Sequence, residues 1–100
     1  MIILVNIGKS LAKGMSHLEA TKRMLKLNLE RCKACDYVVG VAHGVPQCFF
    51  LLKDVFPDIE DPTRVAFDLE PCYKEEEENL MKILRWNNTN FKGIQRGRYV

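Results

Sequence analysis

Two β-prone runs separated by a His-Gly pair constrain the fold of this chain more than any other feature. Residues 36–42 and 45–55 are rich in valine and phenylalanine, and His43 and Gly44 stand between them. Glycine adopts positive φ freely, and histidine tolerates it better than a β-branched residue does. The pair therefore suits the tight turn of a hairpin, and we expect two antiparallel strands in the middle of the chain.

Three further segments have strand character. Residues 1–7 are almost wholly apolar and end at Gly8, which predicts a central strand. In residues 63–70 apolar and mostly polar positions alternate, which is the period of a half-buried antiparallel strand. The closing residues 98–100 are expected to add a last short strand.

Two segments have helical character. Ser16 and Glu19 have the spacing of a capping box, which predicts a helix that begins at His17 and runs to about Cys35 on a three- and four-residue apolar stripe. The acidic run 75–78 favours a second helix start, since carboxylates are stabilised at a helix N-terminus. Residues 8–15 and 56–62 are expected to be loops.

These segments predict one α+β domain over residues 1–100, with the order β-α-β-β-β-α-β. We expect a mixed, curved or barrel-like sheet flanked by two helices. The composition, 47% apolar and 28% charged, is that of an ordinary globular chain. The longest apolar stretches, 1–5 and 48–52, are far shorter than the roughly 20 residues that span a bilayer. Residues 1–5 also lack the flanking features of a signal peptide, so we expect a cytoplasmic protein that does not enter a membrane.

The charges are arranged in blocks. Residues 1–35 carry a net charge of +5, residues 36–84 carry −7 and residues 85–100 carry +4. If the two basic ends meet in the fold, they form a surface that attracts phosphates. Basic residues interleaved with aromatic ones suit single-stranded nucleic acid, because cations follow the phosphates and flat rings stack on the bases.

This pattern gives the first hypothesis, a binding module for RNA, DNA or a nucleotide that needs no cofactor and performs no catalysis. The residues predicted to bind the ligand are Lys9, Ser10, Lys22, Arg23, Lys26, Arg64, Trp86, Arg98 and Tyr99.

A second hypothesis is a protein-interaction or homo-oligomerisation domain, including a homodimer. It would use an exposed sheet edge or the apolar run 49–52, whose consecutive apolar residues must bury both faces of a strand. A third hypothesis, a small enzyme, needs His17 or His43 to meet a carboxylate and a cysteine in one pocket.

Two short motifs have alternative interpretations. Gly8-Lys9-Ser10 matches the end of a phosphate-binding loop, but position 3 is isoleucine where the motif needs glycine, so the loop is incomplete. Cys32 and Cys35 have the spacing of half a zinc site without the usual second pair. We expect no metal, and cysteines that stay reduced and pack as small apolar side chains.

Three stretches carry a resemblance to a known superfamily. Residues 36–50, the segment Arg64-Val-Ala-Phe and the closing Arg98-Tyr-Val together resemble the small PUA-like domains, which include the EVE, ASCH and YTH groups. The resemblance implies a barrel-like mixed sheet with flanking helices. It also implies recognition of RNA or modified bases in a pocket between the sheet and a helix.

Overall fold

The computed structural model describes residues 1–23, 25–95 and 97–100. Within them the helices and strands are, in chain order, β1 (Ile2–Asn6), α1 (Gly8–Ala12), α2 (His17–Lys22), α3 (Leu29–Lys33), β2 (Tyr37–Ala42), β3 (Val45–Pro57), β4 (Val65–Pro71), α4 (Lys74–Trp86) and β5 (Gly97–Tyr99).

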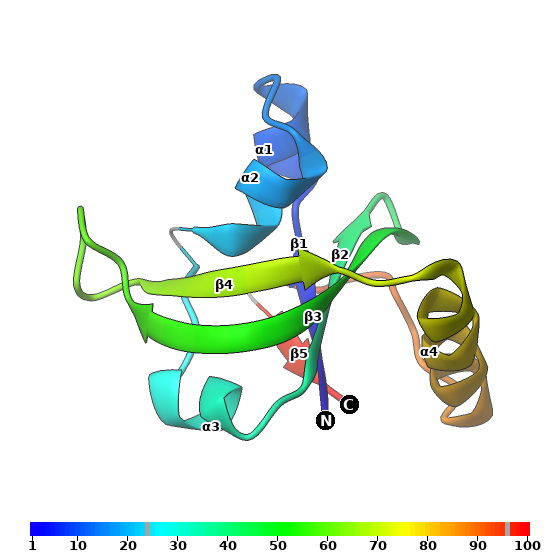
Figure 1. Cartoon of the computed structure of the whole chain (residues 1–100). Coiled ribbons are helices and arrows are strands. Elements are labelled where there is room, and N and C mark those ends of the chain that lie inside the picture. The colour runs from blue at the N-terminus through cyan, green and yellow to red at the C-terminus, as the bar shows by residue number, and fades with distance from the viewer. Residues whose placement is uncertain (24, 96) are drawn as a thin grey trace.

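The described strands form one mixed sheet in the order β4-β3-β2-β1-β5. β1 pairs with β2 in parallel, and every other neighbouring pair is antiparallel. The α+β class and the mixed sheet are therefore as predicted. The sheet does not close into a barrel, because β4 and β5 lie at opposite ends of the order and do not pair with each other among the described residues (Figure 1).

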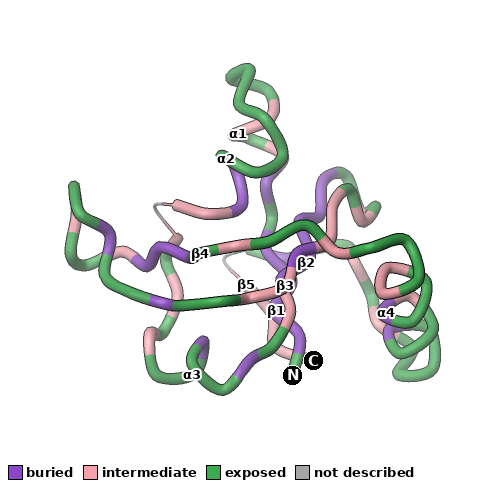
Figure 2. The backbone as a smooth tube through the Cα atoms, viewed as in Figure 1, coloured by how far each residue is buried: buried purple, intermediate pink, exposed green. Residues whose placement is uncertain are grey.

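Each face of the sheet carries its own core. Along β1, Ile3 and Val5 join the core under α2 and α3, whereas Ile2 and Leu4 join the core under α4. This follows from the period of two in a strand, and it explains why all four residues are apolar and buried. Figure 2 shows the buried segments concentrated in the middle of the molecule, where β1 and β2 run. The helices therefore cover both faces, with α4 on its own side.

The long helix predicted from His17 to Cys35 is wrong in its length. Its start is confirmed, since the Ser16 hydroxyl accepts a hydrogen bond from the Glu19 N–H at 3.1 Å. The helix ends at Lys22, and a second helix, α3, begins after Asn28, whose side chain accepts from the Arg31 N–H at 3.0 Å. Between the two helices, Leu25 exchanges both backbone hydrogen bonds with Val65 of β4, at 3.0 and 2.8 Å. The backbone around Leu25 thus finds its partner in a strand 40 positions away rather than in its own helical turn.

The loop expected over residues 8–15 is also partly wrong, because its first half forms the short helix α1. The central hairpin is confirmed. His43 and Gly44 have φ of 54° and 74°, and strands β2 and β3 continue directly from them. Positive φ at both central residues is the twist-compatible form of a two-residue turn.

The second half of the chain follows the sequence prediction closely. In β4, Val65 and Phe67 are buried on the same core, as the alternation predicted, but Ala66, expected on the wet face, is buried as well. Helix α4 begins next to the acidic run, and the Glu76 carboxylate accepts from the Tyr73 N–H at 3.0 Å. The apolar run 49–52 is divided between the two cores of its own chain, with Phe49 on one and Leu52 on the other. That run therefore gives no support to an oligomer interface.

Candidate functional site

A hollow of about 510 Å³ opens between helices α1 and α2, the loop before β4 and the segment before β5. Asn6 at the end of β1 and Leu25 in the link between α2 and α3 also line it. Of the nine residues predicted to bind a ligand, the ones that line this hollow are Lys9, Ser10, Arg23, Lys26 and Arg64. The sequence signals for them were unrelated, and the fold brings them together. We call this hollow and its two neighbours the basic groove.

Two neighbouring hollows share residues with the first. One of about 480 Å³ shares Lys26 and Arg64. The other, of about 600 Å³, shares Asn6 and Lys9, and adds the hairpin turn and Lys92. The three hollows are therefore connected through shared residues.

Besides the pairing of β1 with β5, Asn6 links the two basic ends of the chain. Its side-chain amide donates to the Ile94 carbonyl at 2.9 Å, and its side-chain oxygen accepts from the Gly8 N–H at 3.0 Å. The segment that carries Lys92 is thereby held beside the start of α1, which carries Lys9. The basic beginning and end of the sequence do converge at this groove.

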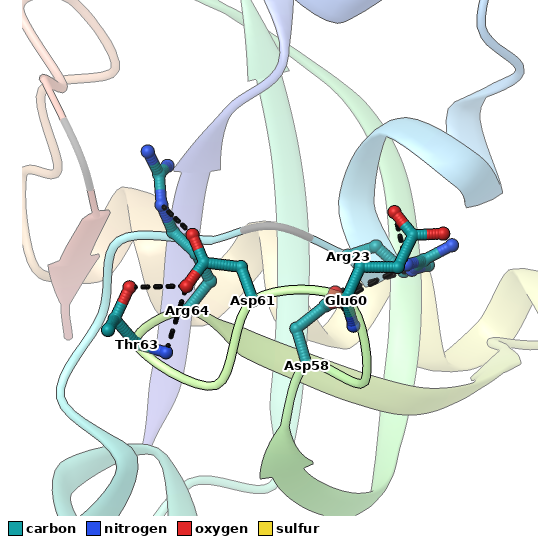
Figure 3. A network of polar contacts seen from close by, with 6 residues as sticks. All are labelled: Arg23, Asp58, Glu60, Asp61, Thr63 and Arg64. Atoms are coloured by element: carbon teal, nitrogen blue, oxygen red, sulfur yellow. Dashed lines mark hydrogen bonds and ion pairs between the residues drawn. The ribbon is translucent and has the colours of Figure 1, made fainter.

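Arg23 is held inside the groove by two carboxylates, as Figure 3 shows. Its guanidinium donates to both oxygens of Asp58, at 3.3 and 3.1 Å, and lies 3.3 Å from Glu60. Asp58 is fully buried, and its side chain also accepts from the Glu60 N–H at 2.9 Å. Hydrogen bonds to Asp58 and then to Glu60 raise the pKa of Arg23 above its ordinary value. Arg23 therefore anchors the loop before β4 and is already neutralised.

The same loop positions Arg64. Asp61 accepts hydrogen bonds from the hydroxyl and N–H of Thr63, at 2.6 and 3.1 Å, and these lower the pKa of its carboxyl. Arg64 lies with its Nε 3.6 Å from that carboxylate (Figure 3). Arg23 is paired with two carboxylates and Arg64 with one, so the positive charge of the two arginines is largely balanced.

The lysines differ in this respect. Within the described residues, Lys9, Lys26 and Lys92 make no ion pair, whereas Lys22 pairs with Glu19 at 3.0 Å. All three unpaired lysines are exposed. These lysines supply the positive charge in the groove that is available to contact a ligand.

The predicted stacking residues lie elsewhere. Tyr99 points to the core under α3, where its hydroxyl lies 3.6 Å from the Cys32 sulfur and its ring lies under the Arg31 guanidinium. Burial raises the pKa of Tyr99 to about 12. Trp86 is 88% exposed at the end of α4, and Arg98 donates to the Asn90 carbonyl on the face that α4 covers. None of these three residues lines the groove.

The sequence-based reasoning missed Phe91 and Lys92 as site residues, although both were visible in the basic, aromatic tail. Phe91 lines the hollow that also contains Lys9, and His43 at the hairpin turn lies on its rim. Their assignment needed the Asn6 contact, which no sequence signal announces. Phe91 and His43 are thus two flat rings that line the same hollow as Lys9 and Lys92.

All four cysteines are free thiols. Cys32 and Cys35 are buried thiols, and burial raises the pKa of both. Burial also raises the pKa of Cys48, and that of Cys72 to about 11. Among the residues that the structure describes, no three His, Cys, Asp or Glu side chains gather to hold a metal ion.

Comparison with protein-family models, with curated proteins and with solved structures gave no match to this chain. In the described part of the chain, no helix combines the length and apolar character that crossing a membrane requires.

Proposed function

We propose that this protein is a binding module for phosphate-bearing ligands, and that single-stranded RNA or DNA is its main ligand class. The observation that carries the proposal is the convergence of Lys9, Lys26 and Lys92, three cations without an ion pair among the described residues, along one groove. A polyanion that follows the groove neutralises them without breaking any existing salt bridge.

The different roles of the arginines and the lysines in the groove support this proposal. Arg23 is satisfied by Asp58 and Glu60 and acts as a positioning residue for the loop that carries Arg64. The lysines act as point charges toward phosphates, which suits binding with little sequence preference. Phe91 and His43 provide a surface on which a base can stack next to Lys9 and Lys92.

The length of the groove favours an oligonucleotide over a mononucleotide. Its three hollows, of about 480, 510 and 600 Å³, lie in series through shared residues, so several phosphates can be met at once. A resemblance to PUA-like domains and a cytoplasmic location remain part of this proposal as hypotheses.

The test is fluorescence anisotropy with labelled single-stranded RNA and DNA oligonucleotides, and with a labelled mononucleotide, over a range of salt. Each phosphate contact contributes roughly −0.7 to the slope of log K against log salt for a single strand, so three contacts predict a slope near about −2. Removing one of the three lysines, as in Lys26→Ala or Lys9→Ala, is expected to weaken binding about threefold to tenfold and to reduce the slope by about one contact.

The matched control is Lys82→Ala, because Lys82 is an exposed lysine on α4 that lines none of the three hollows. It is expected to leave the affinity unchanged. The proposal fails if no oligonucleotide binds at low salt, or if Lys82→Ala weakens binding as much as Lys26→Ala does. Tighter binding of the mononucleotide than of either oligonucleotide would restrict the ligand to a free nucleotide.

A further inference from the structure

The hollow of about 600 Å³ beside the turn between β2 and β3 differs in charge from the other two hollows of the basic groove. We call it the hairpin hollow. Its described lining residues include Lys9 and Lys92 and no aspartate or glutamate. The hollow of about 510 Å³ contains Glu19 and Glu60, and that of about 480 Å³ contains Asp61. A phosphate in the hairpin hollow would therefore meet cations without a carboxylate beside them.

The main chain on both sides of Lys92 is held in place. The Lys92 N–H donates to the side-chain oxygen of Asn90 at 3.0 Å, and the Asn90 carbonyl accepts from Arg98. On the other side, Ile94 is buried, and its carbonyl accepts from Asn6 at 2.9 Å. The position of Lys92 is therefore set by contacts that do not involve its ammonium group.

The side chain of Lys92 lies over the hairpin turn at Gly44. An ideal Cβ on Gly44 would lie 2.9 Å from Cγ, 3.8 Å from Cδ and 3.5 Å from Cε of Lys92. The methylene stem of the lysine thus runs across the space that a side chain at position 44 would fill. A lysine that is ordered along its stem loses less rotamer freedom when its ammonium group binds a phosphate. Gly44 therefore provides the room in which Lys92 is ordered, besides the positive φ that the turn requires.

An aromatic ring is fixed at the same place. Phe91 packs against the core under α4, and it also lines the hairpin hollow. A ring held by a core offers a surface for a base with little further loss of side-chain freedom. The volume of the hollow lies within the roughly 300–1,000 Å³ of small-molecule sites. The hairpin hollow therefore combines ordered positive charge and a ring on the scale of one nucleotide.

We propose that the hairpin hollow is the anchoring subsite of the basic groove and takes one nucleotide unit, with its phosphate on Lys9 and Lys92 and its base against Phe91. Gly44 sets the affinity of this subsite, because it gives the stem of Lys92 its place. This inference rests on the proposed nucleic-acid binding. It adds that the lysines of the groove contribute unequally to binding.

The first experiment is a double-mutant cycle at positions 44 and 92, measured by fluorescence anisotropy with a labelled single-stranded oligonucleotide. Lys92→Ala is expected to weaken binding about tenfold, more than Lys26→Ala does, and Gly44→Ala about threefold to fivefold. In the Lys92→Ala background, Gly44→Ala should have no further effect, because its target is already absent.

The matched control is Gly14→Ala. Gly14 has a φ of 89°, against 74° at Gly44, and an ideal Cβ on Gly14 would have no atom within 4 Å. Both variants place an alanine at positive φ, but only Gly44→Ala displaces Lys92. Gly14→Ala should therefore leave the affinity unchanged, and thermal unfolding of both variants checks that each is folded at the assay temperature.

The second experiment needs no variant. Adenosine 5′-monophosphate is added to the full chain labelled with nitrogen-15, and the amide signals are followed by NMR. The nucleotide is expected to shift the signals of the hairpin turn and of residues 91–93. Shifts centred on Lys26 and Arg64 would place the nucleotide in another hollow and overturn the proposal.

The proposal is also overturned if Gly44→Ala binds the oligonucleotide as tightly as Gly14→Ala does, or if the effects of Gly44→Ala and Lys92→Ala simply multiply in the double variant. With the wild-type chain still binding the oligonucleotide, either result removes the anchoring subsite and leaves the proposed function in place. Absence of oligonucleotide binding by the wild-type chain at low salt removes the proposed function, and the subsite with it.

Discussion

Replacing Gly40 by alanine adds a methyl group at a point in β2 where three side chains already meet. An ideal Cβ on Gly40 would lie 2.6 Å from the Cys48 sulfur, 2.9 Å from the Ile7 Cδ1 and 3.0 Å from the Thr21 Oγ1. These atoms come from β3, from the end of β1 and from α2, and both Ile7 and Thr21 are fully buried. The missing side chain is what allows α2 to lie directly on the sheet and to form one wall of the basic groove.

The cost can be worked from these contacts. Overpacking a core by one methyl group typically costs about 1–3 kcal/mol, and a shift is required here in three elements at once, so we expect about 2 kcal/mol. For a domain of this size, each kcal/mol lowers the melting temperature by about 4–8 °C, which gives a decrease of about 8–16 °C. Gly8→Ala is the matched control, since its Cβ would have only Asn6 Oδ1 within 3.4 Å, at 3.3 Å. It should change the free energy of unfolding by less than about 0.5 kcal/mol.

The assay is urea unfolding followed by circular dichroism, on the two single variants, on Cys48→Ala and on the double variant Gly40→Ala/Cys48→Ala. Cys48→Ala removes the nearest atom, so the double variant should recover about 1 kcal/mol relative to the sum of the single variants. A free energy of unfolding unchanged in Gly40→Ala would refute the packing of α2 on β2. Strict additivity in the double variant would show that the clash with Cys48 is not its cause.

Two further predictions concern side chains buried near the groove and under α3. Arg23→Met should lower the free energy of unfolding in urea more than Glu60→Gln does, because Arg23→Met removes the guanidinium from the buried Asp58 whereas Glu60 is an exposed carboxylate. Equal effects of the two substitutions would contradict the assignment. The pKa of Tyr99 is raised by burial from 10.0 to about 12, so the folded state holds this proton more tightly than the unfolded chain does. The contribution of Tyr99 to stability is complete below pH 10 and is lost as the pH rises to about 12. Tyr99→Phe should therefore flatten the fall of the urea midpoint between pH 10 and about 12. An equal fall of the midpoint in both proteins would show that the pKa of Tyr99 is not raised.

The parts of the fold that were predicted correctly have local causes. The hairpin depends on His43 and Gly44, whose positive φ needs only the turn itself. The start of α2 depends on Ser16 and Glu19, three positions apart, and the start of α4 follows its acidic first turn. The burial of Val65 and Phe67 on one face of β4 likewise follows the period of two in a strand, whereas the burial of Ala66 on the other face was not predicted.

The candidate site could be predicted only in part. Lys9, Lys26 and Arg64 were recognisable as cations next to loops and helices, and they do meet in the groove. Lys22 was chosen on the same grounds, yet it lines a different hollow and pairs with Glu19. Trp86 and Tyr99 were chosen for their rings, whose positions depend on which face of the sheet each element covers.

The sequence by itself determined the strands, the hairpin turn, the starts of α2 and α4 and the uneven distribution of charge, because each of these depends on neighbours within a few positions. Only the tertiary structure decided where the helix after His17 ends, since Leu25 pairs with a strand 40 positions later. It also decided that the two basic ends meet, through the pairing of β1 with β5 and the hydrogen bond from Asn6 to Ile94. Contacts between segments far apart in the chain depend on how all the elements pack together, and a local pattern of residues does not encode them.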